Sequence, residues 1–177
     1  MRNILLVLFV VALGAAAYFW LQPQLAGSST AAGGSTGASV VAEPGIPSGA
    51  TDAWVEYVHD GDTLFLQDGR KVRPLGINTP EIGGHLECYG NEATAALRAM
   101  LPEGTHVWVP RDRDPLDQYG RSLPFSYTDA GTNVNLALLQ QGDSEVMQFK
   151  SNYLLSDELR ASETAARDAR LGLWGAC

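Results

Sequence analysis

Charged side chains are almost absent from the first quarter of this 177-residue chain. Between Arg2 and Glu43 there is no Asp, Glu, Lys or Arg, which excludes an ordinary water-exposed domain surface for this stretch. Residues 4–21 are instead an uninterrupted apolar run of 18 residues, about the minimum length of a membrane-spanning helix. We therefore expect residues 1–21 to be a signal peptide or a signal anchor, which is a transmembrane helix.

The single charged side chain before the apolar run predicts its orientation. Arg2 and the amino terminus are expected to stay in the cytoplasm, so the rest of the chain is exported. Residues 15–17 are three alanines, which suit cleavage, but the run continues through residues 18–21 with aromatic residues typical of a membrane interface. The pattern favours a membrane-anchored domain outside the cytoplasm and leaves a cleaved, secreted form open.

Large apolar residues are scarce in residues 22–50, which are rich in Gly, Ser, Ala and Thr. Such a segment buries too little apolar surface to offset the entropy lost on ordering. We expect a flexible linker there. The remaining residues, 51–177, have the length of a single domain.

Cysteine is also rare, and Cys88 and Cys177 are the only two. They do not form the closely spaced pairs of common zinc sites. An exported domain meets oxidising conditions, in which a disulfide between them would pin the carboxyl terminus to the domain. Two unpaired thiols are the alternative, because the sequence does not give their separation in space.

Basic residues are outnumbered by acidic ones. The chain has 12 Lys and Arg against 20 Asp and Glu, so its formal net charge is −8. Only Arg2 and Glu43 precede residue 51, and the net charge therefore belongs to the domain. A strong nonspecific nucleic-acid binder presents a basic face to phosphates, and this composition argues against that class.

The periodicity of the domain predicts short strands followed by helices. Alternating, β-branched and aromatic residues predict strands at residues 54–58, 63–67, 71–77, 106–109 and 123–127, with a charged loop before the last. Helical spacing predicts helices at about 91–101, 133–141 and 156–171, the last with Ser156 as N-cap. This order predicts an α+β fold in which three helices pack on a small antiparallel barrel.

Asp60-Gly61-Asp62-Thr63 places two carboxylates around a glycine just before a predicted strand. The backbone freedom of Gly61 lets the carboxylates turn toward a shared point, and hard cations such as calcium prefer oxygen ligands. Tight turns use the same residues routinely. The motif alone therefore does not distinguish a metal site from a turn.

The segment from Arg73 to Glu81 places an arginine in an apolar strand and a carboxylate after a turn bounded by prolines. The guanidinium of Arg73 suits bidentate binding of a phosphate, and Glu81 can take a proton from water. A structural salt bridge between Arg73 and Glu81 is an equally good interpretation of these two residues alone.

A third motif, Asp117-Gln118-Tyr119-Gly120-Arg121, ends the charged loop and places Arg121 at the start of a strand. A second arginine there can bind the charge that develops on a phosphate during reaction. Tyr119 is a candidate for stacking on a base. Taken alone, an arginine in a charged loop is more often a surface residue.

Together and in this order, the motifs resemble those of the thermonuclease, or staphylococcal nuclease, family. The set also includes Tyr89-Gly90-Asn91-Glu92-Ala93, which opens a predicted helix, and the resemblance covers nearly all of residues 55–174. It implies a five-stranded antiparallel barrel of the oligonucleotide-binding type with three packed helices. It also implies Ca²⁺-dependent hydrolysis of phosphodiester bonds in DNA, RNA or both.

The resemblance implies a calcium site. Asp62 and Asn78 are the expected side-chain ligands, and Thr79 contributes its backbone carbonyl. Well-studied members of the family have an aspartate at the position of Asn78, whose amide oxygen can bind calcium but brings no negative charge. We therefore expect weaker calcium binding.

The resemblance also implies a catalytic set. Arg73 and Arg121 are expected to bind the phosphate and its transition-state charge, and Glu81 to orient or deprotonate the attacking water. Tyr119 is the further substrate-binding candidate. The tyrosines that the family uses around the nucleotide have no counterparts at residues 146–150, so contacts to the base should differ.

The sequence thus predicts an exported, monomeric nuclease, and an acidic domain can act on nucleic acid if its site is locally positive and holds a cation. The alternative is a noncatalytic barrel that binds an oligonucleotide or a protein partner. A weaker one is an interaction module displayed on the outer face of a membrane. A nuclease requires both arginines to point away from structural carboxylates. It also requires the five candidate metal-binding and catalytic side chains to converge on one cleft: Asp62, Arg73, Asn78, Glu81 and Arg121.

Overall fold

The computed structural model describes residues 45–148, 152 and 154–177. The predicted signal segment, residues 1–21, and most of the predicted linker lie outside the described residues. Within these ranges no helix is both long enough and apolar enough to cross a membrane. Ile46, in the predicted linker, packs against the hydrophobic core of the domain.

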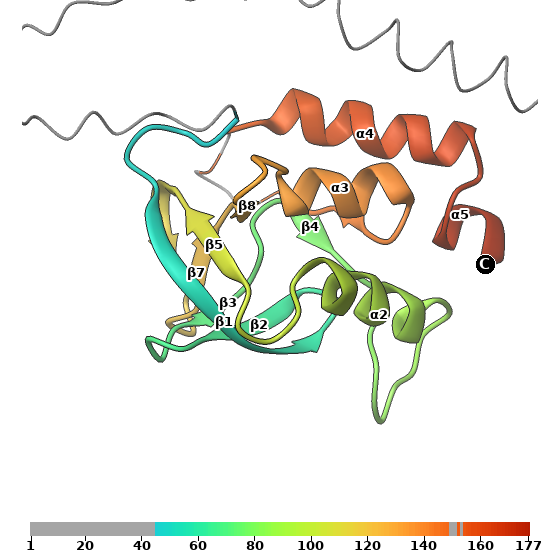
Figure 1. The fold of residues 1–177 in the computed structure, drawn as a ribbon. Helices are drawn as coiled ribbons and strands as arrows, with labels where there is room; N and C mark the ends of the chain where they lie inside the picture. The colour runs from blue at the N-terminus through green and yellow to red at the C-terminus, as the bar shows by residue number, and fades with distance from the viewer. Residues whose placement is uncertain (1–44, 149–151, 153) are drawn as a thin grey trace, which may run out of the picture. The chain divides into compact units, whose positions relative to one another are not determined.

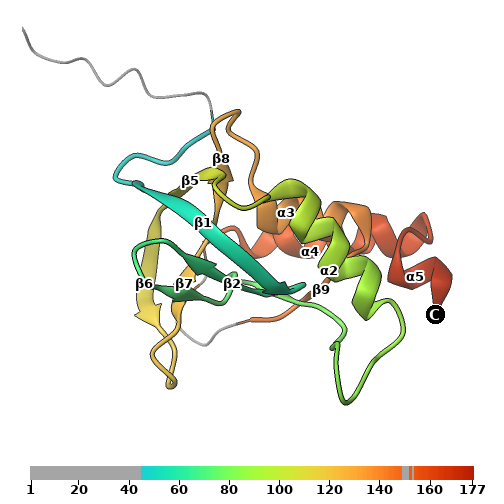
Figure 2. The same ribbon diagram turned by 60° about the horizontal axis from the view of Figure 1, so that its bottom comes forward.

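Two β-sheets form the first layer of the domain (Figures 1 and 2). The strands of the described part of the chain are β1 Thr51–Asp60, β2 Thr63–Leu66, β3 Lys71–Val72, β4 Ile77–Asn78, β5 His106–Val109, β6 Arg111–Leu116, β7 Ser122–Pro124, β8 Tyr127–Thr128 and β9 Glu145–Val146. Seven of them form one sheet in the order β6-β7-β3-β2-β1-β5-β8, and β4 pairs with β9 in the other. The long strand β1 joins the two halves of the large sheet, because its first residues pair with β5 and its later ones with β2.

Helices cover one side of the large sheet. They are α2 Gly90–Met100, α3 Val134–Gln141, α4 Ser156–Asp168 and the short α5 Leu173–Ala176. The helix α2 packs against β1, and α3 lies between α2 and α4 (Figure 1). The core between these layers contains fully buried side chains such as Val55, Leu64, Ile77, Leu97 and Phe125. Burial of each such side chain contributes about 1.5 to 3 kcal/mol to folding.

The α+β class is confirmed, but the sheet is not the predicted five-stranded antiparallel barrel. The large sheet has seven strands, its β3 and β7 pair in parallel, and no hydrogen-bonded closure joins its edge strands β6 and β8 within the described residues. The chain passes from β5 to β6, on opposite sides of the sheet order, through Pro110 alone. Because proline has no N–H to continue a ladder, the pairing is interrupted where the sheet turns back.

Two predicted strands are divided in the structure. The strand predicted at 71–77 becomes β3 and β4, because Pro74 cannot donate to a ladder and Gly76 has a positive φ of 81°. The strand predicted at 123–127 becomes β7 and β8, because the N–H of Ser126 donates to the buried side chain of Asn135 at 3.1 Å.

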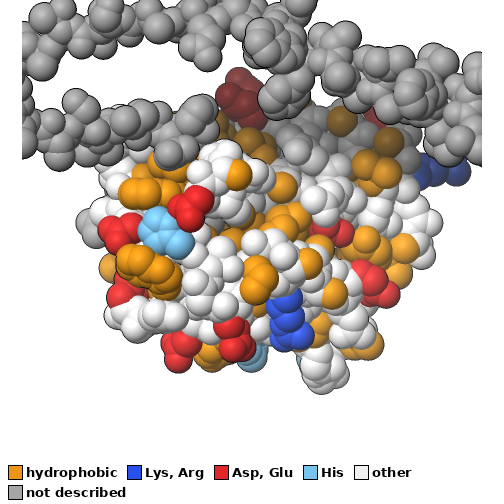
Figure 3. Space-filling model, in the orientation of Figure 1, with side chains coloured by type: hydrophobic (Ala, Val, Ile, Leu, Met, Phe, Trp, Pro, Cys, Tyr) orange, Lys and Arg blue, Asp and Glu red, His pale blue; other side chains and the backbone are white. Residues whose placement is uncertain are grey.

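The predicted helices at 91–101 and 133–141 are confirmed to within one residue at each end. The third begins at Ser156 as predicted but ends at Asp168, and α5 was not predicted. Ser156 is not the N-cap, which is Leu155 with a φ of 61°. On the face drawn in Figure 3, acidic side chains are more widespread than basic ones, as the net charge of −8 suggests.

Candidate active site

The turn between β1 and β2 brings Asp62 against Thr79. The side chain of Asp60 accepts the N–H of Asp62 at 3.1 Å, and Asp62 Oδ2 accepts the N–H of Thr79 at 2.8 Å. A Cβ on Gly61 would lie 2.6 Å from Thr79 Oγ1, so only glycine permits this approach of the two segments. Asp62, Asn78 and Thr79, the three expected calcium ligands, therefore lie in one place.

Arg73 is buried in the middle of this group. Its Nη1 donates to the carbonyl of Ile77 at 2.7 Å, and its Nη2 donates to Asn78 Oδ1 at 3.0 Å. The same Nη2 lies 3.0 Å from Asp62 Oδ2, and the side chains of Arg73 and Asp62 are only 6% and 9% exposed. One guanidinium nitrogen thus bridges the two expected side-chain ligands.

The pKa values of this buried pair reflect opposing effects. Burial raises the pKa of Asp62, while the charge of Arg73 and the N–H of Thr79 act in the opposite direction. Burial also lowers the pKa of Arg73, against the effect of Asp62, and the positive charge of Arg121 lowers it further. Arginine remains protonated in proteins, so Arg73 presents a positive charge to the carboxyl group of Asp62.

Glu81 lies at the edge of the same group, at the start of an exposed loop. Burial raises the pKa of Glu81, and the negative charges of Asp62, Asp60 and Glu87 raise it further. Arg73 acts in the opposite direction. Glu81 thus interacts electrostatically with both members of the buried pair.

Arg121 is held by its own motif. Its Nε donates to Asp117 Oδ2 at 2.6 Å, and Asp117 Oδ1 accepts the N–H groups of Tyr119 and Arg121, both at 2.9 Å. These N–H donors and the charge of Arg121 lower the pKa of Asp117, although burial acts against them. The guanidinium lies 5.6 Å from the ring centroid of Tyr119, which is 76% exposed.

An open groove of about 560 Å³ lies beside Arg121. Tyr119 and Arg121 form one side of it, and Met147, Gln148 and Asn152 also line it. Met147 connects the groove to the buried pair, because its Sδ lies 3.7 Å from Arg73 Nη2. The groove therefore extends from Arg121 to Met147, the side chain that contacts Arg73.

The structure thus places Asp62, Arg73, Asn78 and Thr79 in direct contact and Glu81 beside them. Arg121 contributes from the adjoining groove. Both arginines form ion pairs with carboxylates, Arg73 with Asp62 and Arg121 with Asp117, contrary to the expectation for a nuclease that they point away from such groups.

The oxygen donors fit a hard cation. In the part of the chain that the structure describes, no three His, Cys, Asp or Glu side chains cluster as a metal site. The expected calcium site would not appear as such a cluster, because its ligands are one carboxylate, one amide oxygen and one backbone carbonyl. Asp62 Oδ2 and Asn78 Oδ1 already face the same positive group, the guanidinium of Arg73, so a cation of calcium's chemistry suits these two oxygens.

Sequence reasoning missed the residues that hold the site in shape. Asp117 is the first residue of the motif that ends at Arg121, but its role as the hydrogen-bond acceptor for Arg121 was not predicted. Glu87 accepts the N–H of Glu81 at 2.9 Å and has no sequence signal at all. Met147 lies in the segment where family tyrosines are missing, and that departure was its only signal.

Comparison with known proteins finds a matching family and several relatives. The family described as staphylococcal nuclease homologue matches residues 71–176, a segment that includes Arg73, Asn78, Glu81 and Arg121. Endonuclease YncB of Bacillus subtilis (strain 168) is 31% identical over 122 residues, which cover 65% of this chain and 57% of YncB. Endonuclease YhcR of the same organism is 26% identical over 151 residues, which cover 75% of this chain and 12% of YhcR.

A relative from a second organism is also similar. The uncharacterized protein MJ1439 of Methanocaldococcus jannaschii is 30% identical over 146 residues, covering 68% of this chain and 70% of that protein. The chain spans little more than half the length of YncB and a small part of YhcR. The similarity to these two endonucleases is therefore limited to a part of each that corresponds to the domain of this chain.

Proposed function

The chain belongs to the family of staphylococcal nuclease homologues, and from that premise we propose that it is a calcium-dependent nuclease that hydrolyses phosphodiester bonds of DNA, RNA or both. The observation that carries the proposal is the buried guanidinium of Arg73, held 3.0 Å from both Asp62 Oδ2 and Asn78 Oδ1. A buried arginine between two oxygen ligands, with a glutamate and a second arginine nearby, is an arrangement suited to phosphate chemistry.

Asp62, Asn78 and the carbonyl of Thr79 would hold the calcium ion. When bound, calcium would supply Lewis-acid polarisation of the phosphate and a template for the substrate. The chain's own contribution is to fix these oxygens: the N–H of Thr79 orients the carboxylate of Asp62, and Gly61 permits the close approach of the two segments.

The two arginines would bind the phosphate. Arg73 has its Nη1 fixed by the carbonyl of Ile77, so its position costs little reorganisation during reaction. Arg121 would turn from Asp117 toward a phosphate in the groove, where Tyr119 can stack on a base. Loss of one such donor typically lowers kcat by about 10² to 10³-fold.

Glu81 would act as the general base or orient the attacking water. Burial and the neighbouring carboxylates raise its pKa, which makes it a stronger base than an ordinary glutamate and brings it closer to neutral pH. The backbone of Glu81 is held at both its N–H and its carbonyl by Glu87, so the side chain starts from a fixed position.

We further propose that the domain is exported and monomeric. The apolar run at residues 4–21 and the single preceding Arg2 support export. The bond between Cys88 and Cys177 supports an oxidising compartment. Residues 1–21 would be a membrane anchor or a cleaved signal peptide, and residues 22–50 a linker.

A noncatalytic module that binds an oligonucleotide or a protein partner is the second candidate. It is favoured by the ion pairs of Arg73 and Arg121 with carboxylates and by the missing charge at Asn78. In that case the arginines would stabilise the fold, and oligonucleotides would bind in the groove without being cut.

The test is cleavage of labelled single-stranded and duplex DNA, and of RNA, by the purified full chain with calcium or with a chelator. We expect calcium-dependent cleavage that falls by about 10² to 10⁴-fold in Glu81→Gln. The same change at the exposed Glu103 should have no effect. A folded protein that binds oligonucleotides and cuts none of them at millimolar calcium would instead establish the noncatalytic module.

A further inference from the structure

We propose that the disulfide between Cys88 and Cys177 positions Glu81, and that reduction of this disulfide turns the nuclease down. The inference rests on the proposed function, because it assigns a determinant to the reaction of Glu81. It concerns the loop from Glu81 to Gly90, which we call the Glu81 loop.

The Glu81 loop closes on the backbone of Glu81 at three points. The N–H of Glu87 donates to the carbonyl of Glu81, and the N–H of Glu81 donates to Glu87 Oε2, both at 2.9 Å. Gly90 packs on the same carbonyl so closely that a Cβ at this position would meet its oxygen. The position of Glu81 is therefore set by residues 87–90.

The rest of the loop has little to order it. Residues 83–88 are exposed and belong to no helix or strand, and a Cβ on Gly83 or Gly84 would meet nothing within 4 Å. Segments with few buried contacts open at low free energy. The order of this loop therefore depends on attachments near its end, and Cys88 lies between Glu87 and Gly90.

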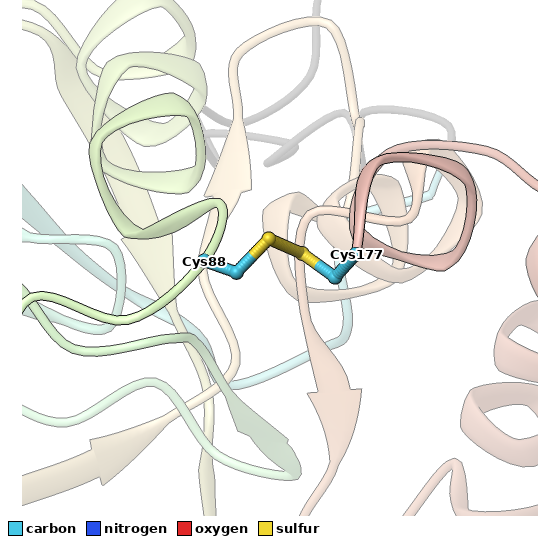
Figure 4. The surroundings of a disulfide bond; sticks show 2 residues. All are labelled: Cys88 and Cys177. Carbon is cyan, nitrogen blue, oxygen red and sulfur yellow. A yellow bond between two sulfur atoms is a disulfide. The ribbon is translucent and has the colours of Figure 1, made fainter.

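Cys88 is bonded to Cys177, the last residue of the chain (Figure 4). The carboxyl-terminal end is itself fixed, because the N–H of Leu173 donates to the carbonyl of Gly142 at 2.9 Å. The guanidinium of Arg167 lies 3.8 Å from the centroid of the Trp174 ring. The disulfide thus ties the end of the Glu81 loop to the helical layer.

A second attachment runs parallel to the disulfide. The hydroxyl of Tyr89 donates to Asp143 Oδ1 at 3.1 Å, next to the Gly142 that holds α5. This is a single hydrogen bond between partly buried groups, so it is weaker than a covalent bond. Loss of the disulfide would leave this hydrogen bond, the packing of Gly90 and the hydrogen bond from the N–H of Ala93 to the carbonyl of Tyr89, none of which is covalent.

The redox step is an ordinary thiol–disulfide exchange. A dithiol reductant supplies two electrons and two protons, the S–S bond breaks, and Cys88 and Cys177 become thiols while the reductant becomes a disulfide. In a reducing cytoplasm the chain would therefore have a loosely placed Glu81. Oxidation after export would then restore the full rate, which would protect nucleic acids in the producing cell.

The first experiment compares the oxidised full chain, the chain reduced by dithiothreitol, and the reduced chain reoxidised, all with calcium and labelled DNA. We expect reduction to lower kcat by about 10 to 100-fold with KM changed far less, because a small misplacement of a reacting group has this effect. Reoxidation should restore kcat. The Cys88→Ser/Cys177→Ser variant should match the reduced chain and ignore the reductant.

A second experiment separates positioning from general stability. In the Glu81→Gln background, removal of the disulfide should cause no further loss of kcat, because both changes act through one residue. Glu87→Ala should lower kcat with the disulfide intact, and Glu87→Gln, which keeps an acceptor for the N–H of Glu81, should restore it. A further loss in the Glu81→Gln background would show a merely structural disulfide and overturn the inference.

The outcomes also distinguish the inference from the proposed function. Equal calcium-dependent cleavage by the oxidised and reduced chains would overturn the inference and leave the nuclease standing. An oxidised, folded chain that cuts nothing would overturn both.

Discussion

Arg73 occupies the place where a cation is expected, since its Nη2 lies 3.0 Å from both Asp62 Oδ2 and Asn78 Oδ1. Calcium would have to take these two oxygens from Nη2 of the guanidinium, and Nη2 would then be available to a phosphate while Nη1 stays on the carbonyl of Ile77. Weak calcium binding without substrate follows from this competition as well as from the neutral side chain of Asn78.

Asn78→Asp should tighten calcium binding. The added negative charge also strengthens the hold on Arg73, but the attraction scales with the product of the charges, so a divalent ion gains more than a guanidinium. We expect the calcium Kd to fall by about 10-fold, measured by calorimetry without substrate. Asn91→Asp, the same change at an exposed position, is the control. An unchanged or higher Kd would argue against Asn78 as a ligand.

Asp143 offers a test of buried charge. Its Oδ1 accepts from Tyr89, its Oδ2 has no partner among the described residues, and burial raises the pKa of the carboxyl despite the Tyr89 hydrogen bond. A raised pKa in the folded state means that the protonated carboxyl stabilises the fold relative to the ionised one. The contribution of Asp143 to the free energy of unfolding is therefore fully present below the ordinary aspartate pKa, and it is lost as pH rises through the pKa of the folded state.

Asp143→Asn should therefore raise the melting temperature at neutral pH by a few degrees. The gain should shrink as the pH is lowered toward the ordinary aspartate pKa of about 3.9, where both proteins are uncharged at this position. Thermal unfolding followed by circular dichroism at several pH values measures it, with the exposed Asp52→Asn as control. A gain that persists unchanged at low pH would point to another cause.

The sequence could predict which residues of the site meet, but not how they pair. The ordered motifs predicted the meeting of Asp62, Asn78 and Thr79, because the resemblance carries the three-dimensional arrangement with it. The ion pairs of Arg73 with Asp62 and of Arg121 with Asp117 were not predicted. Motif spacing does not state which partner an arginine takes when no phosphate is bound.

At the scale of elements, β6 shows why periodicity failed in one place. Its sequence from Arg111 to Leu116 is charged and contains Pro115, which predicts a loop. It nevertheless pairs with β7, at the edge of the sheet, where charges and proline are tolerated because one side of the strand needs no ladder. Pairing partners of this kind cannot be deduced from local sequence.

Gly90→Ala tests how the first turn of α2 holds Glu81. Alanine normally stabilises a helix relative to glycine by up to about 1 kcal/mol. Here its Cβ would meet the carbonyl of Glu81, which belongs to the backbone and cannot move without carrying Glu81 along. We expect a lower melting temperature and a kcat reduced by about 10 to 100-fold. The control is Gly84→Ala, which has open space around it. A more stable and fully active Gly90→Ala would contradict this packing.

For the whole molecule, the fold class could be predicted from the sequence, but whether the sheet closes into a barrel could not. Strands followed by helices predicted an α+β domain, and α2 and α3 were predicted to within one residue at each end, whereas α4 ends at Asp168, before the predicted residue 171. The seven-stranded open sheet depends on the parallel pairing of β3 and β7 and on Pro110. Both are long-range features without a local periodic signal.

The charge of the whole molecule leads to a last expectation, on salt dependence. A chain of net charge −8 repels nucleic acid at long range, and the proposed site offers only two arginines to phosphates. Binding of single-stranded DNA releases counterions with a slope of log K against log salt of about −0.7 for each phosphate neutralised. Two arginines give about −1.4, and screening of the repulsion by salt makes the slope shallower still.

Titration of labelled single-stranded DNA with the Glu81→Gln chain, at fixed calcium and rising salt, measures this slope without cleavage. Arg121→Ala in the same background should reduce the slope by about 0.7, because one phosphate contact is lost. Arg70→Ala, which removes a cation paired with Asp68 outside the groove, should leave it unchanged. A slope steeper than about −4 would require a basic surface beyond Arg73 and Arg121, and would place the main contacts with nucleic acid elsewhere on the molecule.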